Sequence, residues 1–186
     1  DGSGEAWIID SDGNIKKIDA YGTEIPISGL DDGPYTTLAT NDTGTVVATY
    51  DDGVSGDGGD SIKLYDSTGA EVPLPDGRLI DANLDDSSVV YGINSNGSVF
   101  LYDEGVTAGW HYTGGTLTPG TLQVDNANGV MWGTNNNGSL YSYQHGVAGF
   151  VNHGKYTDIS TDDTTGDISA IDSNGDSIIV SDIYPN

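Results

Sequence analysis

The sequence predicts an all-β fold, a β-propeller of five blades with about four antiparallel strands and 40 residues each. Three observations support this prediction. Similar Asp- or Asn-rich turns recur at nearly constant spacing along the chain. A short strand rich in β-branched and aromatic residues follows each turn. Glycine is frequent, with 28 in 186 residues, which indicates many short elements joined by turns rather than long helices.

The turns supply the period. One position in each unit is Asp or Asn: Asp10, Asp51, Asn94, Asn135 and Asp172. These positions are 41, 43, 41 and 37 residues apart. Four of the turns contain Asp-Gly or Asn-Gly, as in Asn96-Gly97, which predicts two-residue type I′ hairpins with positive φ at both central residues. The second unit instead carries an insertion at 51–61.

The strands of each unit follow from this alignment as A, B, C and D, with the turn between B and C. The C strands are expected at 15–18, 62–65, 99–102, 140–143 and 178–181, and the D strands at 24–27, 71–74, 109–112 and 149–152. The whole chain then forms one domain with units at about 1–30, 31–77, 78–115, 116–154 and 155–186. The first unit begins at strand B and the last stops before strand D. We therefore expect other residues, or a neighbouring molecule, to complete the ring.

The net charge of −24 arises from 29 acidic and 5 basic residues, and cysteine is absent. Of the acids, 25 are Asp and only four are Glu. Because the short Asp side chain bonds nearby backbone N–H groups, this preference indicates a role in turns. Such a surface excludes nucleic acid and insertion into membranes, and favours cations and basic partners.

Two segments, "VVYGINSNGSVFLYD" and "GVMWGTNNNGSLYSYQ", have the form aliphatic, aromatic, Gly, then Asn-rich turn, Gly and an aliphatic–Tyr strand. This pattern resembles the tectonin or tachylectin repeat over residues 88–152 and is weaker elsewhere. The resemblance implies a β-propeller of five or six blades and, for many members, sugar binding.

Candidate ligand-binding residues lie in the D strands of units 3 and 4: Trp110, His111, Tyr112, Phe150, Asn152 and His153. Sugars bind to aromatic faces while Asn or Asp side chains bond their hydroxyl groups. An alternative is that Trp110 and Phe150 form core between blades, since their counterparts Ile25 and Val72 are aliphatic. The two histidines would then be solvated side chains near the rim.

A calcium site is a second hypothesis. The glycine-rich insertion places Asp51, Asp52, Asp57 and Asp60 in one loop, and hard cations bind several oxygens of a flexible loop. The alternative is an acidic, solvated loop. Three triplets, at Asn41, Asn96 and Asn137, are formal N-glycosylation sites, a number close to the two or three expected by chance.

No catalytic constellation is evident. The chain has no cysteine nucleophile, and His111, His145 and His153 show no zinc-type spacing. The sequence therefore predicts a non-catalytic, lectin-like binding module located outside the cell or on a cell or virion surface, with a glycan or surface protein as partner. The alternative is a structural subunit of a virion, filament or surface layer that self-assembles through strand contacts.

Overall fold

All regular secondary structure in the described residues is β-strand, as the sequence predicts. The computed structural model describes residues 4–27, 33–51, 60–104, 109–126, 128–147, 149–162 and 167–180. Within these ranges, no helix is long and apolar enough to cross a membrane.

Within the described residues, eighteen strands form five blades in sequence order. Blade 1 contains β1 (Ala6–Ile9), β2 (Ile15–Ile18) and β3 (Glu24–Ile25). Blade 2 contains β4 (Tyr35–Thr40), β5 (Val46–Tyr50), β6 (Asp60–Tyr65) and β7 (Glu71–Val72), with β8 (Arg78–Leu79) also paired to β6. Blade 3 contains β9 (Asp81–Leu84), β10 (Val90–Ile93), β11 (Ser98–Tyr102) and β12 (His111–Thr116).

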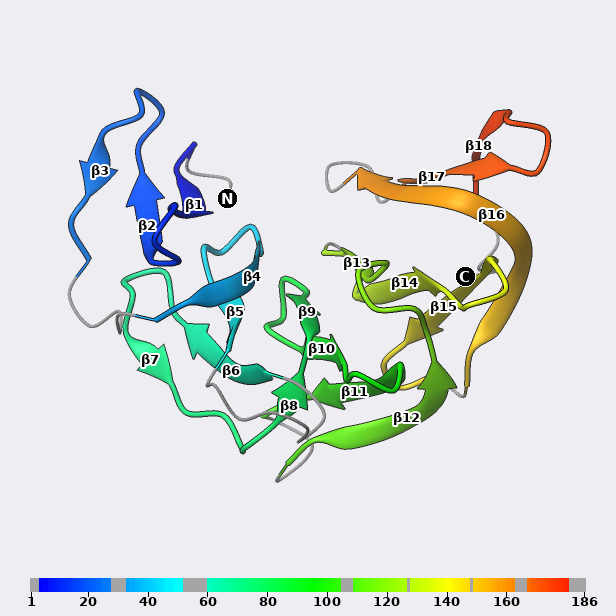
Figure 1. The fold of residues 1–186 in the computed structure, drawn as a ribbon, viewed down its shortest axis with the longest axis horizontal. Helices are drawn as coiled ribbons and strands as arrows, with labels where there is room; N and C mark the ends of the chain where they lie inside the picture. Colours follow the sequence, from blue (N-terminus) through cyan, green and yellow to red (C-terminus); the bar gives the residue numbers. More distant parts are fainter. Residues whose placement is uncertain are drawn as a thin grey trace.

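Blade 4 contains β13 (Gln123–Asp125), β14 (Val130–Thr134), β15 (Ser139–Gln144) and the first part of β16 (Val151–Asp162). Blade 5 contains the second part of β16 with β17 (Asp167–Asp172) and β18 (Ser177–Ile179). The five blades follow an open arc with blades 1 and 5 at its ends (Figure 1). Strand β9 lies beside both β4 and β13, and these A strands line the inner side of the arc (Figure 1).

The predicted strand order A to D is therefore confirmed, with differences in extent. The D strands expected from 109 and 149 begin at His111 and Val151, so Trp110 and Phe150 directly precede them. Strand β16 is one bent strand of 12 residues, where the sequence predicted separate D and A strands. Its pairing shifts from β15 to β17 near Tyr156, so one strand serves two blades. Strands β3 and β7 are shorter than predicted because Pro26 and Pro73 follow them directly and have no N–H to donate.

The four B–C hairpins with Asp-Gly or Asn-Gly adopt a turn other than type I′, so that prediction was wrong. In the β10–β11 hairpin, Gly97 N–H donates to Asn94 O at 2.9 Å and Asn94 N–H donates to Ser98 O at 3.1 Å. Gly97 has φ +81°, whereas Asn96 is not among the described residues with positive φ. This is a three-residue loop, a type I turn closed by a left-handed glycine.

The side chain of the first turn residue explains this choice. Asn94 Oδ1 accepts hydrogen bonds from the N–H groups of Asn96 at 3.1 Å and Ser98 at 2.9 Å. The same pair of bonds forms at six further turn positions: Asp10, Asp19, Asp66, Asp85, Asn135 and Asp172. At Asn41 the side chain accepts the N–H of Thr45 and the hydroxyl of Thr43. The predicted role of Asp in turns is thus confirmed.

The hairpin glycines also connect successive blades. The carbonyl of Gly13 accepts the N–H of Tyr35 at 2.9 Å, that of Gly97 accepts Leu117 at 2.8 Å, and that of Gly138 accepts Tyr156 at 2.9 Å. In each case the donor residue leads into the A strand of the next blade. The turn motif therefore fixes both the hairpin and the position of its neighbour.

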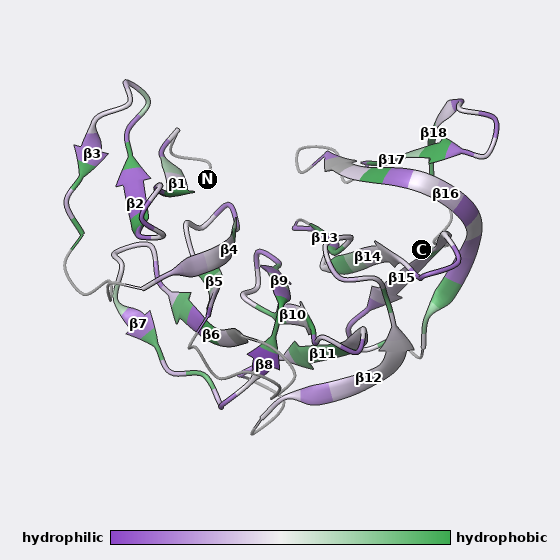
Figure 2. Cartoon of the chain, in the orientation of Figure 1, coloured by the Kyte–Doolittle hydropathy of each residue, from purple (hydrophilic) through white to green (hydrophobic). Residues whose placement is uncertain are grey.

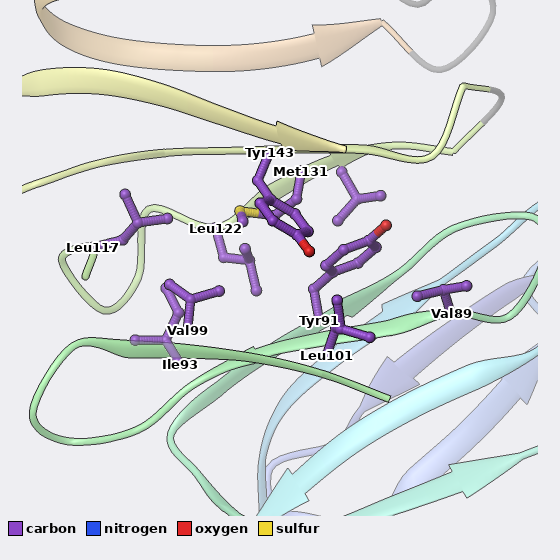
Figure 3. Close-up of a cluster of buried hydrophobic side chains, with 10 residues drawn as sticks. Val89, Tyr91, Ile93, Val99, Leu101, Leu117, Leu122, Met131 and Tyr143 are labelled. Carbon is purple, nitrogen blue, oxygen red and sulfur yellow. The ribbon is translucent and has the colours of Figure 1, made fainter. Parts of the chain in front are cut away.

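Hydrophobic side chains fill the spaces between adjacent blades. Figure 3 shows Tyr91 and Leu101 of blade 3 facing Met131 and Tyr143 of blade 4. Tyr91 also donates its hydroxyl to the carbonyl of Gly129 in blade 4 at 3.0 Å. Figure 2 shows hydrophobic residues concentrated in β10, β11 and β14, while β16 alternates between hydrophobic and hydrophilic. The blades are thus held together by contacts between faces, as expected for a repeat architecture.

The turn carboxylates give an expected pH dependence of stability. A backbone N–H bond from Asn14 lowers the pKa of Asp10, the Thr68 hydroxyl lowers the pKa of Asp66, and a backbone bond from Asp176 lowers the pKa of Asp172. Because these folded-state pKa values lie below the unfolded ones, their contribution is present above about pH 4 and is lost as the pH falls through the folded values. Burial instead raises the pKa of Asp81 and of Asp85, so their contribution is lost as the pH rises through their folded pKa values.

The D10N/D172N variant should therefore lose less stability below pH 4 than the natural chain. Asn retains the accepting oxygen, as Asn94 and Asn135 show at equivalent positions, but it cannot titrate. Urea unfolding followed at a series of pH values between about 2.5 and 7 measures this difference. If the unfolding free energy had the same slope against pH in both proteins, Asp10 and Asp172 would not contribute to the pH dependence of stability.

Candidate functional site

Two equivalent pockets lie at successive blade junctions. The 2/3 pocket, between blades 2 and 3, is about 220 Å³ and is lined by Asp76, Gly77, Arg78, Leu79, Asn94, Phe100 and Trp110. The 3/4 pocket, between blades 3 and 4, is about 460 Å³ and is lined by Thr113, Gly114, Gly115, Thr116, Asn135, Tyr141, Gly149 and Phe150. The volume of the 3/4 pocket falls within the range of about 300–1,000 Å³ that is usual for ligand sites.

The strand registers establish the equivalence. Phe100 is paired with Gly92 across β10–β11, and Tyr141 is paired with Gly133 across β14–β15. Each aromatic residue follows the turn asparagine of its unit, Asn94 or Asn135, by the same interval. The repeat therefore places an asparagine, a C-strand aromatic and the aromatic residue that directly precedes the D strand around each pocket.

Glycine in the preceding blade makes room for the aromatic residue that directly precedes the D strand, Trp110 or Phe150. A Cβ at Gly77 would lie 2.5 Å from Trp110 Nε1, and one at Gly115 would overlap the ring of Phe150. Trp110 Nε1 donates to the carbonyl of Pro75 at 3.0 Å, which fixes the indole across the junction. Both aromatics are half-buried and pack against the interblade clusters. They thus contribute to the core and also to a pocket wall.

A residue of the D strand contacts each C-strand aromatic. Tyr112 lies opposite Phe100, with ring centroids 5.6 Å apart. Asn152 occupies the corresponding place opposite Tyr141 and donates Nδ2–H to the tyrosine hydroxyl at 3.0 Å. Of the six candidates, Trp110 and Phe150 line the two pockets, and Tyr112 and Asn152 each contact a lining aromatic.

The two histidine candidates lie elsewhere. His111 is exposed and pairs with Leu101 across β11–β12. His153 is half-buried, with Nε2 at 2.7 Å from Ser142 Oγ and its ring 4.9 Å from that of Trp132. Burial lowers the pKa of His153, which favours the neutral imidazole. Neither histidine lines the 2/3 or 3/4 pocket.

The calcium hypothesis falls largely outside the described residues. Asp52 and Asp57 are not described, and only the backbone of Asp60 is, as part of β6. Asp51 is exposed, and its N–H donates to the carbonyl of Pro34 at 3.3 Å. In the described ranges, no group of three or more His, Cys, Asp or Glu residues is placed to hold a metal ion.

The three glycosylation candidates differ in access. Asn96 and Asn137 are exposed at hairpin tips. Asn41 is only 1% exposed, and its Nδ2 donates to the carbonyl of Asp85 at 2.9 Å. Because that nitrogen is the atom that a glycan would modify, attachment at Asn41 requires loss of a buried bond between blades 2 and 3.

Two other hollows have linings that differ from those of the two junction pockets. One, of about 550 Å³ between blades 2 and 3, includes the carboxylates Asp66, Asp103 and Glu104. The other, of about 350 Å³ beside β6, includes Lys63 and Arg78, and Lys63 is paired with Glu71 at 2.7 Å. Asp103 lies 3.4 Å from Nδ1 of His145 across the next junction.

Sequence reasoning missed the residues that complete the two pockets, namely Phe100, Tyr141, Gly77 and Gly115. A signal was available for the first two, because aligned units 3 and 4 place them at one position in the C strand. The glycines gave no signal, since their role depends on an aromatic residue of the next blade. The pockets offer ring faces, hydroxyl groups and backbone amides, and Asp76 is the one carboxylate among their lining residues.

No protein-family model matches the sequence, and no curated protein matches it. Solved structures do resemble the fold. The Dos1 propeller has a TM-score of 0.61 at 12% identity, and the alignment covers 91% of this chain and 48% of that protein. YCF48 bound to D1 peptide has a TM-score of 0.61 at 16% identity, and the alignment covers 96% of this chain and 61% of that protein.

PorZ, a surface component of the type-IX secretion system of Porphyromonas gingivalis, has a TM-score of 0.60 at 9% identity and covers 90% of this chain. The chain spans only 22% to 61% of the lengths of these three proteins. At such identities the comparisons concern architecture alone. The fold of the chain is that of a β-propeller.

Proposed function

We propose that the chain is a non-catalytic, glycan-binding propeller module that acts outside the cell or on a cell or virion surface. The observation that carries the proposal is the recurrence of one pocket at two successive junctions. Each copy combines a half-buried aromatic face with a turn asparagine and glycine backbone. Pyranose rings bind to such faces through their C–H surfaces, while amide and hydroxyl groups bond the sugar hydroxyls.

The charge of the chain supports the same class of ligand. Neutral sugars are not repelled by a net charge of −24, whereas nucleic acids and anionic membranes are. The larger 3/4 pocket has no charged side chain in its lining. We therefore assign it to a neutral sugar, and we expect the smaller 2/3 pocket, with Asp76 and Arg78, to bind more weakly.

A glycan array tests this proposal. The natural chain should bind a related set of glycans, and F150A should weaken that binding by at least about 5-fold, because truncating a buried anchor typically costs more than 1 kcal/mol. Y21A is the matched control, since Tyr21 is an aromatic residue that is 93% exposed and lines neither pocket. An array without hits, or equal binding by F150A and the natural chain, would refute the assignment.

A second candidate function is that of a structural subunit assembled through strand contacts. Strand β1 ends the three-stranded sheet of blade 1, and its other edge has no strand partner within the described part of the chain. Ile8 on this strand is exposed. An open edge accepts a further strand by β-augmentation. Light scattering of the purified chain should show concentration-dependent association under this alternative, and a stable monomer under the glycan-binding proposal.

A further inference from the structure

Among their differences, the two pockets carry a different C-strand aromatic at one equivalent position. The C-strand aromatic is Phe100 in the 2/3 pocket and Tyr141 in the 3/4 pocket. Opposite Phe100 is Tyr112, which is 50% exposed and contacts the Phe100 ring. Opposite Tyr141 is Asn152, whose amide bonds the hydroxyl. The repeat therefore presents two versions of one site, one with phenylalanine and one with a hydrogen-bonded tyrosine at the same lining position.

The backbone fixes the orientation of the Asn152 amide. Gly154 N–H donates to Asn152 Oδ1 at 2.8 Å, and an N–H group can donate only to the oxygen of the amide. Nδ2 therefore faces Tyr141 and donates to its hydroxyl oxygen at 3.0 Å. Because the hydroxyl acts as an acceptor in this bond, its own hydrogen points away from Asn152 and remains a directed donor.

We infer that Tyr141 determines the specificity of the 3/4 pocket by donating its hydroxyl hydrogen to one hydroxyl group of a bound pyranose. Asn152 is the positioning residue that holds the tyrosine in this donor state. The 2/3 pocket, with Phe100 and Tyr112, binds sugar without this bond and does not select for that hydroxyl. The inference rests on the proposed function, since it concerns the same pocket and the same class of ligand.

Methyl pyranosides and their monodeoxy analogues provide the test. In NMR titrations of the full chain with methyl glucoside, galactoside and mannoside, the amide signals of Gly114 and Gly149 report the 3/4 pocket. One deoxy analogue should bind the natural chain about 2- to 10-fold more weakly than its parent, the range of one hydrogen bond. Y141F, which copies Phe100, should bind parent and analogue equally.

A second variant tests the positioning role. N152D preserves the acceptor for Gly154 N–H, but its carboxylate would accept the Tyr141 hydrogen and turn it away from the sugar. N152D should therefore lose discrimination between parent and analogue while Tyr141 remains in place. If Asn152 had a purely structural role, N152D would weaken the binding of parent and analogue by the same factor. The ratio of their two affinities would then stay unchanged.

The outcomes separate the two claims. If no methyl pyranoside shifts the pocket signals of the natural chain, both the proposed function and this inference are overturned. If the sugars bind and F150A abolishes binding, but Y141F keeps the natural discrimination, only the inference is overturned. Loss of discrimination in both Y141F and N152D, with binding retained, supports it.

Discussion

G97A should lower the free energy of unfolding by about 2–5 kcal/mol, a large part of the 5–15 kcal/mol of an ordinary domain. Two costs add in this variant. Gly97 has φ +81°, a conformation that costs an L-residue about 1–2 kcal/mol. A Cβ there would also lie 2.5 Å from the carbonyl oxygen of Leu117 in the chain leading to blade 4. Displacing packed backbone typically adds about 1–3 kcal/mol.

G22A is the matched control for this prediction. Gly22 also has φ +81° and closes the same kind of turn, with its N–H donating to Asp19 O at 3.0 Å. A Cβ at Gly22 would meet nothing within 4 Å. Urea unfolding should therefore show a loss of only about 1–2 kcal/mol for G22A. Equal losses in the two variants would mean that the hairpin glycine does not connect neighbouring blades.

L101A should cost about 2–5 kcal/mol, because it leaves a cavity in the cluster between blades 3 and 4. Leu101 is 1% exposed and packs in this cluster. The repeat offers a control at the corresponding place in blade 5, since Leu101 pairs with Tyr91 and Ile179 pairs with Ser169.

Ile179 is 67% exposed, so I179A should change stability by no more than about 0.5 kcal/mol. Chemical denaturation measures both variants. If I179A were as destabilising as L101A, the outer face of blade 5 would be packed against further structure in solution.

Much of the fold follows from short-range chemistry, which explains why the sequence predicts it. The first residue of each hairpin turn accepts N–H bonds from its own turn, as Asp10, Asn94, Asn135 and Asp172 do. The hairpins and their spacing can therefore be recognised from the local sequence. The turn type was mispredicted because the side chain of the first residue, rather than the Asn-Gly dipeptide, selects the loop. The continuous strand β16 was also missed, because its shift from β15 to β17 depends on the arrangement of two blades.

The pockets are harder to predict because their walls come from different units. Trp110 and Phe150 are recognisable as candidates from the sequence, but Gly77 and Gly115 acquire a role only when the next blade packs on them. Likewise, Asn152 appears in the sequence as a ligand contact, whereas in the structure it bonds Tyr141. Contacts of this kind depend on strand register, which the local pattern does not contain.

The most direct test of the account is to map, by amide chemical shifts, where a methyl pyranoside binds to the full chain. We expect saturable shifts at Gly114, Gly115, Thr116 and Gly149 around the 3/4 pocket, and smaller ones at Gly77 and Arg78 around the 2/3 pocket. Shifts confined to other parts of the chain, such as β1 or β18, would contradict the claim that the repeated junction pockets are the binding sites.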